Sequence, residues 1–278
     1  MQRLAIPWEA LLPQGRHMPR SPSEKRILIT GAGSGIGRAA ALRFAREGAT
    51  IGLLSHTDEE LRTAAADVEE RGGRAEILVA DVSDEEAMAA AVTAFGEAGG
   101  IDVAIVNAGI NGVWAPIADL RPSEWDRTMA VNLRGSYLTI HFAVPYLKRA
   151  GRSAIVVVSS INGTRTFTSA GASAYTATKA AQVALVKQLA VELAGDGIRV
   201  NAVCPGTIDT SIEDNTVRRH TDEAAVPVEW PEGDIPLTGG KAGKADDVAG
   251  SISFLASDAA RHVTGSLVFV DGAQSLLR

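Results

Sequence analysis

The stretch Ile27-Leu28-Ile29-Thr30-Gly31-Ala32-Gly33-Ser34-Gly35-Ile36-Gly37 indicates how the chain folds. Its first three residues form a short apolar run typical of a buried strand, and Gly35 begins a pattern typical of a helix. The glycines between them let the backbone turn sharply and approach a ligand closely. N–H groups at a helix start attract phosphates, so this turn predicts a dinucleotide site rather than an unliganded turn. The candidate contacts are Gly31, Gly33, Ser34, Gly35, Ile36 and Gly37.

The same alternation of strand and helix continues along the chain. Short apolar runs predict strands at Arg26–Thr30, Thr50–Leu54, Ala75–Val79, Val103–Asn107, Ala154–Ser159, Ile198–Val203 and Leu267–Val270. Amphipathic stretches predict helices at Arg38–Glu47, Glu59–Arg71, Asp84–Phe95, Ser123–Arg149, Tyr175–Leu193 and Ala245–Leu255. Unbroken apolar strands are typical of parallel sheets buried on both faces. We therefore expect an α/β fold: one doubly wound, Rossmann-type domain over residues 25–278, with a mainly parallel seven-stranded sheet flanked by helices.

The composition argues against several classes of partner. The chain has 278 residues and a net charge of -6, whereas a nucleic-acid surface is usually basic. No apolar run approaches the roughly 20 residues that span a membrane. The single cysteine, Cys204, excludes an internal disulfide and suits the reducing cytoplasm, where we expect the protein to act. We expect neither nucleic acid nor a membrane as a partner, and no metal site.

Two segments depart from the regular alternation. Residues 1–24 contain closely spaced prolines, which oppose regular structure, so we expect an irregular arm there. Residues 207–243 show no clear strand and contain Pro227, Pro231 and Pro236. A loop this long in a compact domain is usually functional, and we interpret it as a lid on the substrate side.

Tyr175 and Lys179 form a pair suited to proton transfer. They are four residues apart, which places them on one face of a helix. A free tyrosine has a pKa near 10, and a neighbouring ammonium group lowers it by favouring the phenolate. A general acid or base works best when its pKa is close to the working pH. The simpler alternative is a surface pair, but the alanines around it favour close packing.

The glycine turn, Asn107-Ala108-Gly109 and Tyr175-x-x-x-Lys179 together resemble the classical short-chain dehydrogenase/reductase family. The resemblance runs from about residue 25 to about residue 273. It implies hydride transfer between a nicotinamide and a carbonyl or alcohol, with Tyr175 moving the proton. It also implies that Lys179 binds the nicotinamide ribose and that a serine after the fifth strand holds the reacting oxygen. Ser160 fits this position better than Ser159, and Asn132 matches the family's proton-relay asparagine.

The resemblance also assigns the remaining coenzyme contacts. Ser55 takes the place of the acid that usually binds the adenosine ribose, and His56 that of the arginine common in NADP-preferring relatives. Because Ser55, His56 and Thr57 can all donate to a phosphate, the sequence favours NADP over NAD. Further contacts are expected from Asp81, Val82, Asn107, Ala108, Gly109, Tyr175, Lys179, Pro205, Gly206, Ile208 and Thr210.

The substrate stays open at this point between a small polar or sugar-like alcohol or ketone and a 3-oxoacyl thioester. The pocket is expected to draw on residues 110–114, 161–166 and 211–234, with Trp114 and Trp230 as apolar walls. The family resemblance implies a homotetramer or homodimer. A non-catalytic dinucleotide-binding sensor or scaffold on the same fold is the alternative function.

Overall fold

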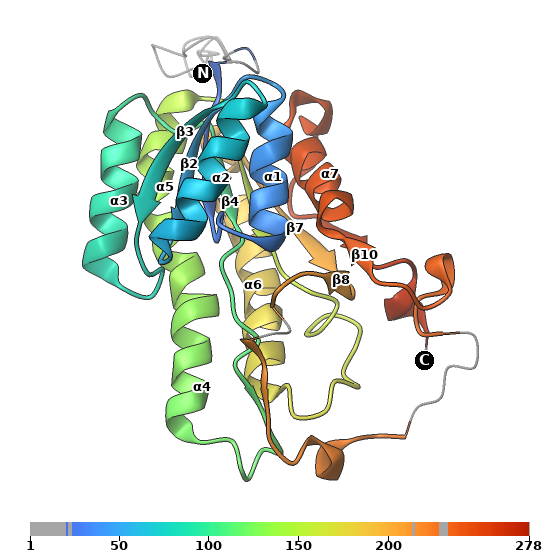
Figure 1. Cartoon of the computed structure of the whole chain (residues 1–278). Helices are drawn as coiled ribbons and strands as arrows, with labels where there is room; N and C mark the ends of the chain where they lie inside the picture. The colour runs from blue at the N-terminus through green and yellow to red at the C-terminus, as the bar shows by residue number, and fades with distance from the viewer. Residues whose placement is uncertain (1–20, 22–23, 213–214, 228–232, 278) are drawn as a thin grey trace, which may run out of the picture.

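The computed structural model describes residues 21, 24–212, 215–227 and 233–277, and its centre is a seven-stranded sheet. The strand order is β11-β7-β6-β4-β1-β2-β3, and every neighbouring pair is parallel. The strands are β1 (Arg26–Thr30), β2 (Thr50–Ser55), β3 (Arg74–Val79), β4 (Val103–Val106), β6 (Ser153–Val158), β7 (Ile198–Pro205) and β11 (Leu267–Val270). The predicted doubly wound α/β fold is therefore confirmed (Figure 1).

Helices cover both faces of the sheet. One face packs against α1 (Gly35–Ala45), α2 (Asp58–Glu70) and α7 (Ala245–Ala256). The other packs against α3 (Glu85–Glu97), α5 (Gly135–Ala150) and α6 (Ser173–Glu192). Each layer buries its own apolar cluster against the sheet, so the central strands are enclosed on both sides, as their unbroken apolar runs predicted. The edge strand β3 is the exception, with Val79 54% exposed.

The long helix predicted at Ser123–Arg149 consists of three connected parts. Its first part is α4 (Pro122–Met129), followed by a π-helical turn, η3 (Ala130–Arg134), and then by α5. A π turn changes the direction of side chains within a helix and is frequent at functional sites. Asn132 lies in this turn, which brings its side chain to the loop after β4.

The segment 207–243 contains short strands, so the prediction that it has none was wrong. Ile208–Asp209 (β8) pairs with Gly243–Lys244 (β10), and Val113–Trp114 (β5) pairs with Val217–Arg218 (β9). These strands have only two residues each, which leaves too little periodicity for a sequence pattern to reveal. The first pair joins the two ends of this segment to each other, and the second attaches its middle to the loop after β4.

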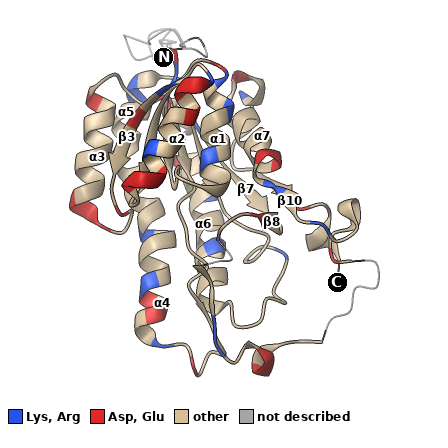
Figure 2. Ribbon diagram, viewed as in Figure 1, with Lys and Arg blue, Asp and Glu red and all other residues tan. Residues whose placement is uncertain are grey.

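The surface carries charges of both signs. Figure 2 shows basic and acidic residues interspersed over the helices in this view. Within the described residues, no helix is long and apolar enough to cross a membrane. Residues 1–20 and 22–23 lie outside the described part of the chain, so the expected irregular arm stays a prediction.

Candidate active site

Hydrogen bonds of Thr30 and Asn107 hold the glycine turn in place. The Thr30 hydroxyl oxygen accepts hydrogen bonds from the backbone N–H groups of Asn107 and Ala108, at 3.0 and 3.2 Å. The Asn107 amide donates to the carbonyl oxygens of Thr30 and Gly31, at 3.0 and 3.2 Å. A Cβ on Gly37 would lie 2.1 Å from the Gly31 carbonyl oxygen, so only glycine fits there. The ends of β1 and β4 are thereby held together.

The start of α1 suits a phosphate. Gly31 and Gly35 adopt positive φ angles of 64° and 52°, which bend the backbone around the turn. The N-cap residue Ser34 makes no side-chain cap, and the first turn of α1 carries no acidic residue. Unpaired N–H groups and the positive end of the helix dipole therefore face the cavity. The residues present fit a dinucleotide pyrophosphate.

A cavity of about 760 Å³ lies along the carboxyl ends of the strands. Its lining includes most of the predicted coenzyme contacts: Gly31, Gly33, Ser34, Gly35, Ile36, Ser55, His56, Thr57, Asp81, Val82, Asn107, Ala108, Gly109, Pro205, Gly206, Ile208 and Thr210. Ser160, Tyr175 and Lys179 also line it. Gly37 and Asn132 lie behind the surface instead. The fold thus brings residues from distant parts of the sequence to one continuous cavity.

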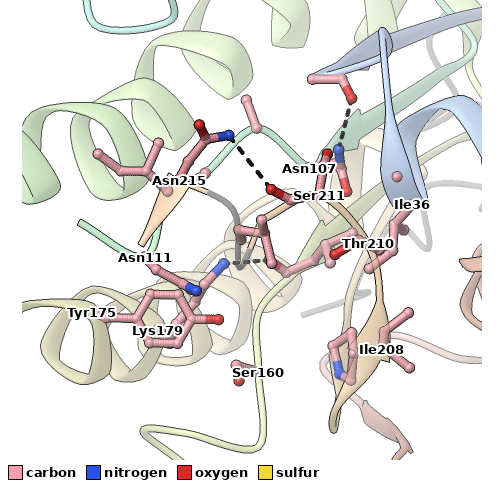
Figure 3. Close-up of a pocket in the computed structure, with 18 of the residues that line it drawn as sticks. Ile36, Asn107, Asn111, Ser160, Tyr175, Lys179, Ile208, Thr210, Ser211 and Asn215 are labelled. Carbon is pink, nitrogen blue, oxygen red and sulfur yellow. Dashed lines mark hydrogen bonds between the residues drawn. The ribbon is translucent and has the colours of Figure 1, made fainter. Parts of the chain in front are cut away.

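Tyr175 and Lys179 lie side by side on α6, as their spacing predicted (Figure 3). The Lys179 Nζ atom is 5.5 Å from the centre of the Tyr175 ring. It donates a 2.9 Å hydrogen bond to the carbonyl oxygen of Val158 at the end of β6. Lys179 is only 4% exposed, so the charged end of this side chain is fixed next to the phenol ring.

Burial lowers the pKa of Lys179 to about 8. The neighbouring thiol of Cys204 does not neutralise it near neutral pH, because burial raises the pKa of Cys204 to about 11. Lys179 is therefore mostly an ammonium group at pH 7, but one held at a cost in folding free energy. Its charge acts in a protein interior, where it is screened less than in water.

The two serines after β6 have different partners. The Ser159 hydroxyl donates to the backbone carbonyl of Lys179 at 2.9 Å, which ties β6 to α6. The Ser160 hydroxyl oxygen accepts a 3.1 Å hydrogen bond from the backbone N–H of Asn162. Accepting this bond leaves the Ser160 hydroxyl proton free to be donated to another oxygen. The geometry favours Ser160 over Ser159 as the group facing a substrate.

Asn132 is buried and its side chain is occupied by protein partners. Its Oδ1 accepts from the Ile110 N–H at 2.8 Å, and its Nδ2 donates to the Ile110 carbonyl at 2.9 Å. Nδ2 also donates to the Thr178 hydroxyl at 3.1 Å. A Cβ on Gly109 would lie 3.3 Å from Asn132 Oδ1 and 3.7 Å from Lys179 Nζ. Asn132 thus joins the loop after β4 to α6.

Asp81 is held by its neighbours at the opposite end of the cavity. It accepts hydrogen bonds from the N–H and hydroxyl of Ser83, at 2.8 and 2.7 Å, and pairs with Arg127 at 3.2 Å. Burial of Asp81 works against its ionisation, but the bonds from Ser83 and Arg127 outweigh it and lower the pKa of the carboxyl. Asp81 is therefore a fixed carboxylate beside the predicted adenine position.

A clamp joins the segment 207–243 to the start of α4. The Arg219 guanidinium donates to both Glu124 carboxylate oxygens, at 2.9 and 2.8 Å. These bonds, helped by the Arg121 N–H, lower the pKa of Glu124 to about 2. Beside them, His220 lies 3.0 Å from Asp119, and this hydrogen bond raises the His220 pKa. These two pairs attach the segment to the loop before α4 and to the first turn of α4.

Trp114 lies between Arg218, next to the clamp, and Tyr175 on α6. Its ring centre lies 6.3 Å from that of Tyr175, and the Arg218 guanidinium lies 5.1 Å from the indole ring. The indole N–H donates to the Asn111 carbonyl at 3.1 Å. The predicted apolar wall at Trp114 lines the cavity, whereas Trp230 lies outside the described residues.

Several lining residues were not predicted from the sequence. They are Glu60, Arg127, Thr168, Ser169 and Gln274. Gln274 lies near the end of the chain, yet its side chain bonds the N–H of Thr207 at 2.8 Å and the carboxylate of Asp234 at 3.1 Å. These residues belong to elements that reach the cavity only through tertiary packing. Their spacing in the sequence carries no signal for that.

A family model described as enoyl-(acyl carrier protein) reductase matches residues 31–273 of this chain. The chain is a classical short-chain dehydrogenase/reductase. The crystal structure of a 3-ketoacyl-ACP reductase from Sinorhizobium meliloti 1021 is similar to this dehydrogenase/reductase, with 58% identity and a TM-score of 0.87. The match covers 91% of this chain and all of that chain.

Two further proteins place the short-chain dehydrogenase/reductase among coenzyme-dependent oxidoreductases. The L-rhamnose 1-dehydrogenase (NAD(P)(+)) of Azotobacter vinelandii is 38% identical, with 90% of this chain and 96% of the relative covered. A 3-ketoacyl-(acyl-carrier-protein) reductase from Brucella melitensis complexed with NADH is 32% identical, with a TM-score of 0.80. That match covers 92% of this chain and 100% of the other. The predicted family and its class of enzyme, NAD(P)-dependent and acting on CH–OH groups, are confirmed.

Proposed function

We propose that this enzyme interconverts a secondary alcohol and a ketone through Ser160, Tyr175, Lys179 and Asn132. The observation that carries the proposal is the buried Lys179 ammonium 5.5 Å from the Tyr175 ring, in a cavity that Ser160 also lines. A charged lysine in a protein interior costs folding free energy, so this position favours a functional role over a structural one.

Each residue has a defined task in the proposed reaction. Tyr175 donates a proton to the substrate oxygen in reduction and removes it in oxidation. The Lys179 charge favours the phenolate form of Tyr175, and Ser160 donates a hydrogen bond to the same substrate oxygen. Asn132 holds the Ile110 loop against α6 and supports proton exchange with solvent. The nicotinamide coenzyme, when bound, supplies or accepts the hydride.

The coenzyme lies, in this proposal, along the line from Asp81 past the glycine turn to Lys179. The pyrophosphate is held by the N–H groups at the start of α1, and Asp81 faces the adenine. The Lys179 ammonium binds the hydroxyls of the nicotinamide ribose. The preference for NADP that Ser55, His56 and Thr57 favour stays a prediction, and Glu60 on α2 opposes it.

For the substrate, we propose a small polar or sugar-like compound. Uncharged polar side chains predominate at the substrate end of the cavity, where the carboxylate of Asp234 also belongs to the lining; they are Asn111, Asn162, Thr166, Thr168, Ser169 and Asn215. Such groups exchange hydrogen bonds with hydroxyls, and Trp114 provides an apolar face for a ring. A 3-oxoacyl thioester is the second candidate, since the similar protein from Sinorhizobium meliloti is named a 3-ketoacyl-ACP reductase.

For the assembly, we propose a homotetramer or homodimer that packs through α5 and α6. Both helices present apolar side chains to the surface: Tyr137 is 51% exposed and Val191 is 79% exposed. Light scattering tests this, because a mass of 29.0 kDa in solution would contradict it. The cytoplasmic location and the lid role of residues 207–243 stay predictions.

The deciding experiment compares wild type with Tyr175→Phe on a panel of hydroxylated ketones and 3-oxoacyl thioesters. We expect the variant to bind coenzyme normally and to lose turnover by at least about 100-fold, because only the proton donor is removed. Absence of wild-type turnover with intact coenzyme binding would favour the sensor alternative. Unchanged turnover in the variant would exclude Tyr175 as the acid and base.

A further inference from the structure

The adenosine-ribose end of the cavity lacks the usual acid on β2. In dinucleotide folds, an acidic residue at the end of the second strand commonly binds the ribose hydroxyls and excludes a 2′-phosphate. Here that strand ends in Ser55, which lines the cavity together with His56 and Thr57. The end of β2 therefore supplies no carboxylate to exclude a 2′-phosphate.

A carboxylate reaches the same place from a different element. Glu60 belongs to the first turn of α2 and lines the cavity beside Ser55, His56 and Thr57. A Cβ placed on Gly33 would lie 2.7 Å from Glu60 Oε2 and 2.8 Å from the Glu60 Cβ. The Glu60 side chain therefore lies directly over the glycine turn, on the side where the adenosine ribose belongs.

The Glu60 carboxylate has no cationic partner in the part of the chain that the structure describes. Among the described residues, none donates a hydrogen bond to its carboxylate or forms an ion pair with it. The nearby arginines are occupied elsewhere: Arg38 pairs with Asp67, Arg62 with Asp58, and Arg127 with Asp81. A 2′-phosphate at this end would meet an unpaired carboxylate and no available guanidinium.

The helix dipole of α2 does not reverse this balance. Its positive end attracts anions, but the first turn of α2 already carries Asp58, Glu59 and Glu60. Arg62 neutralises Asp58, but the full charge of the Glu60 carboxylate at the cavity still exceeds the half charge of a helix end. Ribose hydroxyls, in contrast, are donors that a carboxylate accepts well.

We propose that Glu60, acting from α2, takes over the selection of coenzyme and makes the enzyme prefer NAD(H) to NADP(H). This inference rests on the proposed function, because it assumes that the cavity holds a nicotinamide dinucleotide. It reverses the preference that Ser55, His56 and Thr57 suggest on their own. Glu60 binds the adenosine ribose hydroxyls and repels a phosphate at the 2′ position.

The test measures binding of NADH and NADPH by titration calorimetry to wild type, Glu60→Gln and Glu59→Gln. Glu60→Gln removes the charge of the side chain and keeps its shape. Glu59→Gln is the control, because Glu59 belongs to the same helical turn but does not line the cavity. Thermal unfolding of all three proteins checks that they are folded alike. We expect wild type to bind NADH at least about tenfold more tightly than NADPH, from the repulsion of a dianion at roughly 5 Å in a solvated site.

In Glu60→Gln, we expect NADPH binding to tighten about tenfold and the preference to narrow or disappear. Glu59→Gln is expected to keep the wild-type ratio. Tighter binding of NADPH by wild type, an unchanged ratio in Glu60→Gln, or an equal shift in both variants would overturn the role of Glu60. Failure of wild type to bind either coenzyme would instead overturn the proposed function, and this inference with it.

Discussion

The hydroxyl of Ser159 donates a 2.9 Å hydrogen bond to the backbone carbonyl of Lys179. This bond joins the end of β6 to α6 and gives Ser159 a structural task. Ser160, the next residue, accepts a bond from Asn162 and keeps its own proton for another partner. Two adjacent serines thus have different hydrogen-bond partners, and a matched pair of variants tests whether their roles differ as well.

We expect Ser160→Ala to lower turnover by about 100-fold, because the substrate oxygen loses a donor. Ser159→Ala is expected to keep turnover within a few-fold and to lower the free energy of unfolding by about 1 kcal/mol. Steady-state kinetics and urea unfolding of both variants measure these effects. The assignment is wrong if Ser159→Ala is the variant that loses turnover.

Lys179→Met is expected to lower activity and to raise stability. Turnover should fall at least about 100-fold, since the ammonium charge beside Tyr175 is gone. The free energy of unfolding at pH 7 should rise by about 1 to 3 kcal/mol, because a pKa of about 8 in place of 10.5 means that the charged form is held at a cost. Urea unfolding measures this free energy. A lower free energy of unfolding in Lys179→Met than in wild type would show that Lys179 is a structural residue.

The same lysine predicts how stability depends on pH. Between about pH 8 and 10.5 the unfolded chain keeps a proton on Lys179 that the folded protein has released. The unfolded state then binds more protons, so this group makes the free energy of unfolding rise with pH across that window. We expect the stability advantage of Lys179→Met to shrink from pH 8 to pH 10.5. A difference that stays constant across the window would contradict the lowered pKa.

The two ion pairs of the clamp should respond differently to pH. The Glu124 pKa of about 2 means that the pair with Arg219 persists across the neutral range. His220 has a raised pKa, so its bond to Asp119 is fully present below pH 6.5 and is lost as pH rises through the raised value. Proteolysis of residues 207–243 in Arg219→Ala should be faster than in wild type at every pH from 5 to 9. In His220→Ala, proteolysis should be faster than in wild type at pH 5.5 and equal to it by pH 9.

The same clamp variants also test the role of residues 207–243 as a lid. Arg219→Ala should raise the KM several-fold while kcat changes less, because Arg219 holds the segment and does not touch the reacting atoms. A fall in kcat with unchanged KM would argue that the segment acts on the chemistry itself.

The sequence was sufficient to predict those parts of the structure that depend on the local order of residues. Unbroken apolar runs identified the sheet, with the bounds of β1 and β11 as predicted. The glycine turn and the Tyr175–Lys179 spacing identified both ends of the cavity. These features are short-range, so the order of residues expresses them directly.

What escaped prediction depends on how distant segments pack. The π turn at Ala130–Arg134 divides a stretch that helical periodicity made continuous. Glu60 is one of three acids in the first turn of α2, and only the approach of α2 to Gly33 brings it into the cavity. Gln274 reaches Thr207 across 67 positions of sequence. No local pattern contains such contacts.

The position of Trp114 means that its intrinsic fluorescence reports on the state of the cavity. Its indole lies against the Tyr175 ring on the catalytic helix and under the Arg218 guanidinium of the anchored segment. Indole emission shifts with polarity and is quenched by neighbouring groups, so a substrate that enters, or a segment that lifts away, changes the light from this one side chain. Subtracting the spectrum of a Trp114→Phe variant isolates that signal. The Trp114 emission then follows, in real time, the entry of a ligand or a movement of residues 207–243. The measurement needs neither an added dye nor turnover.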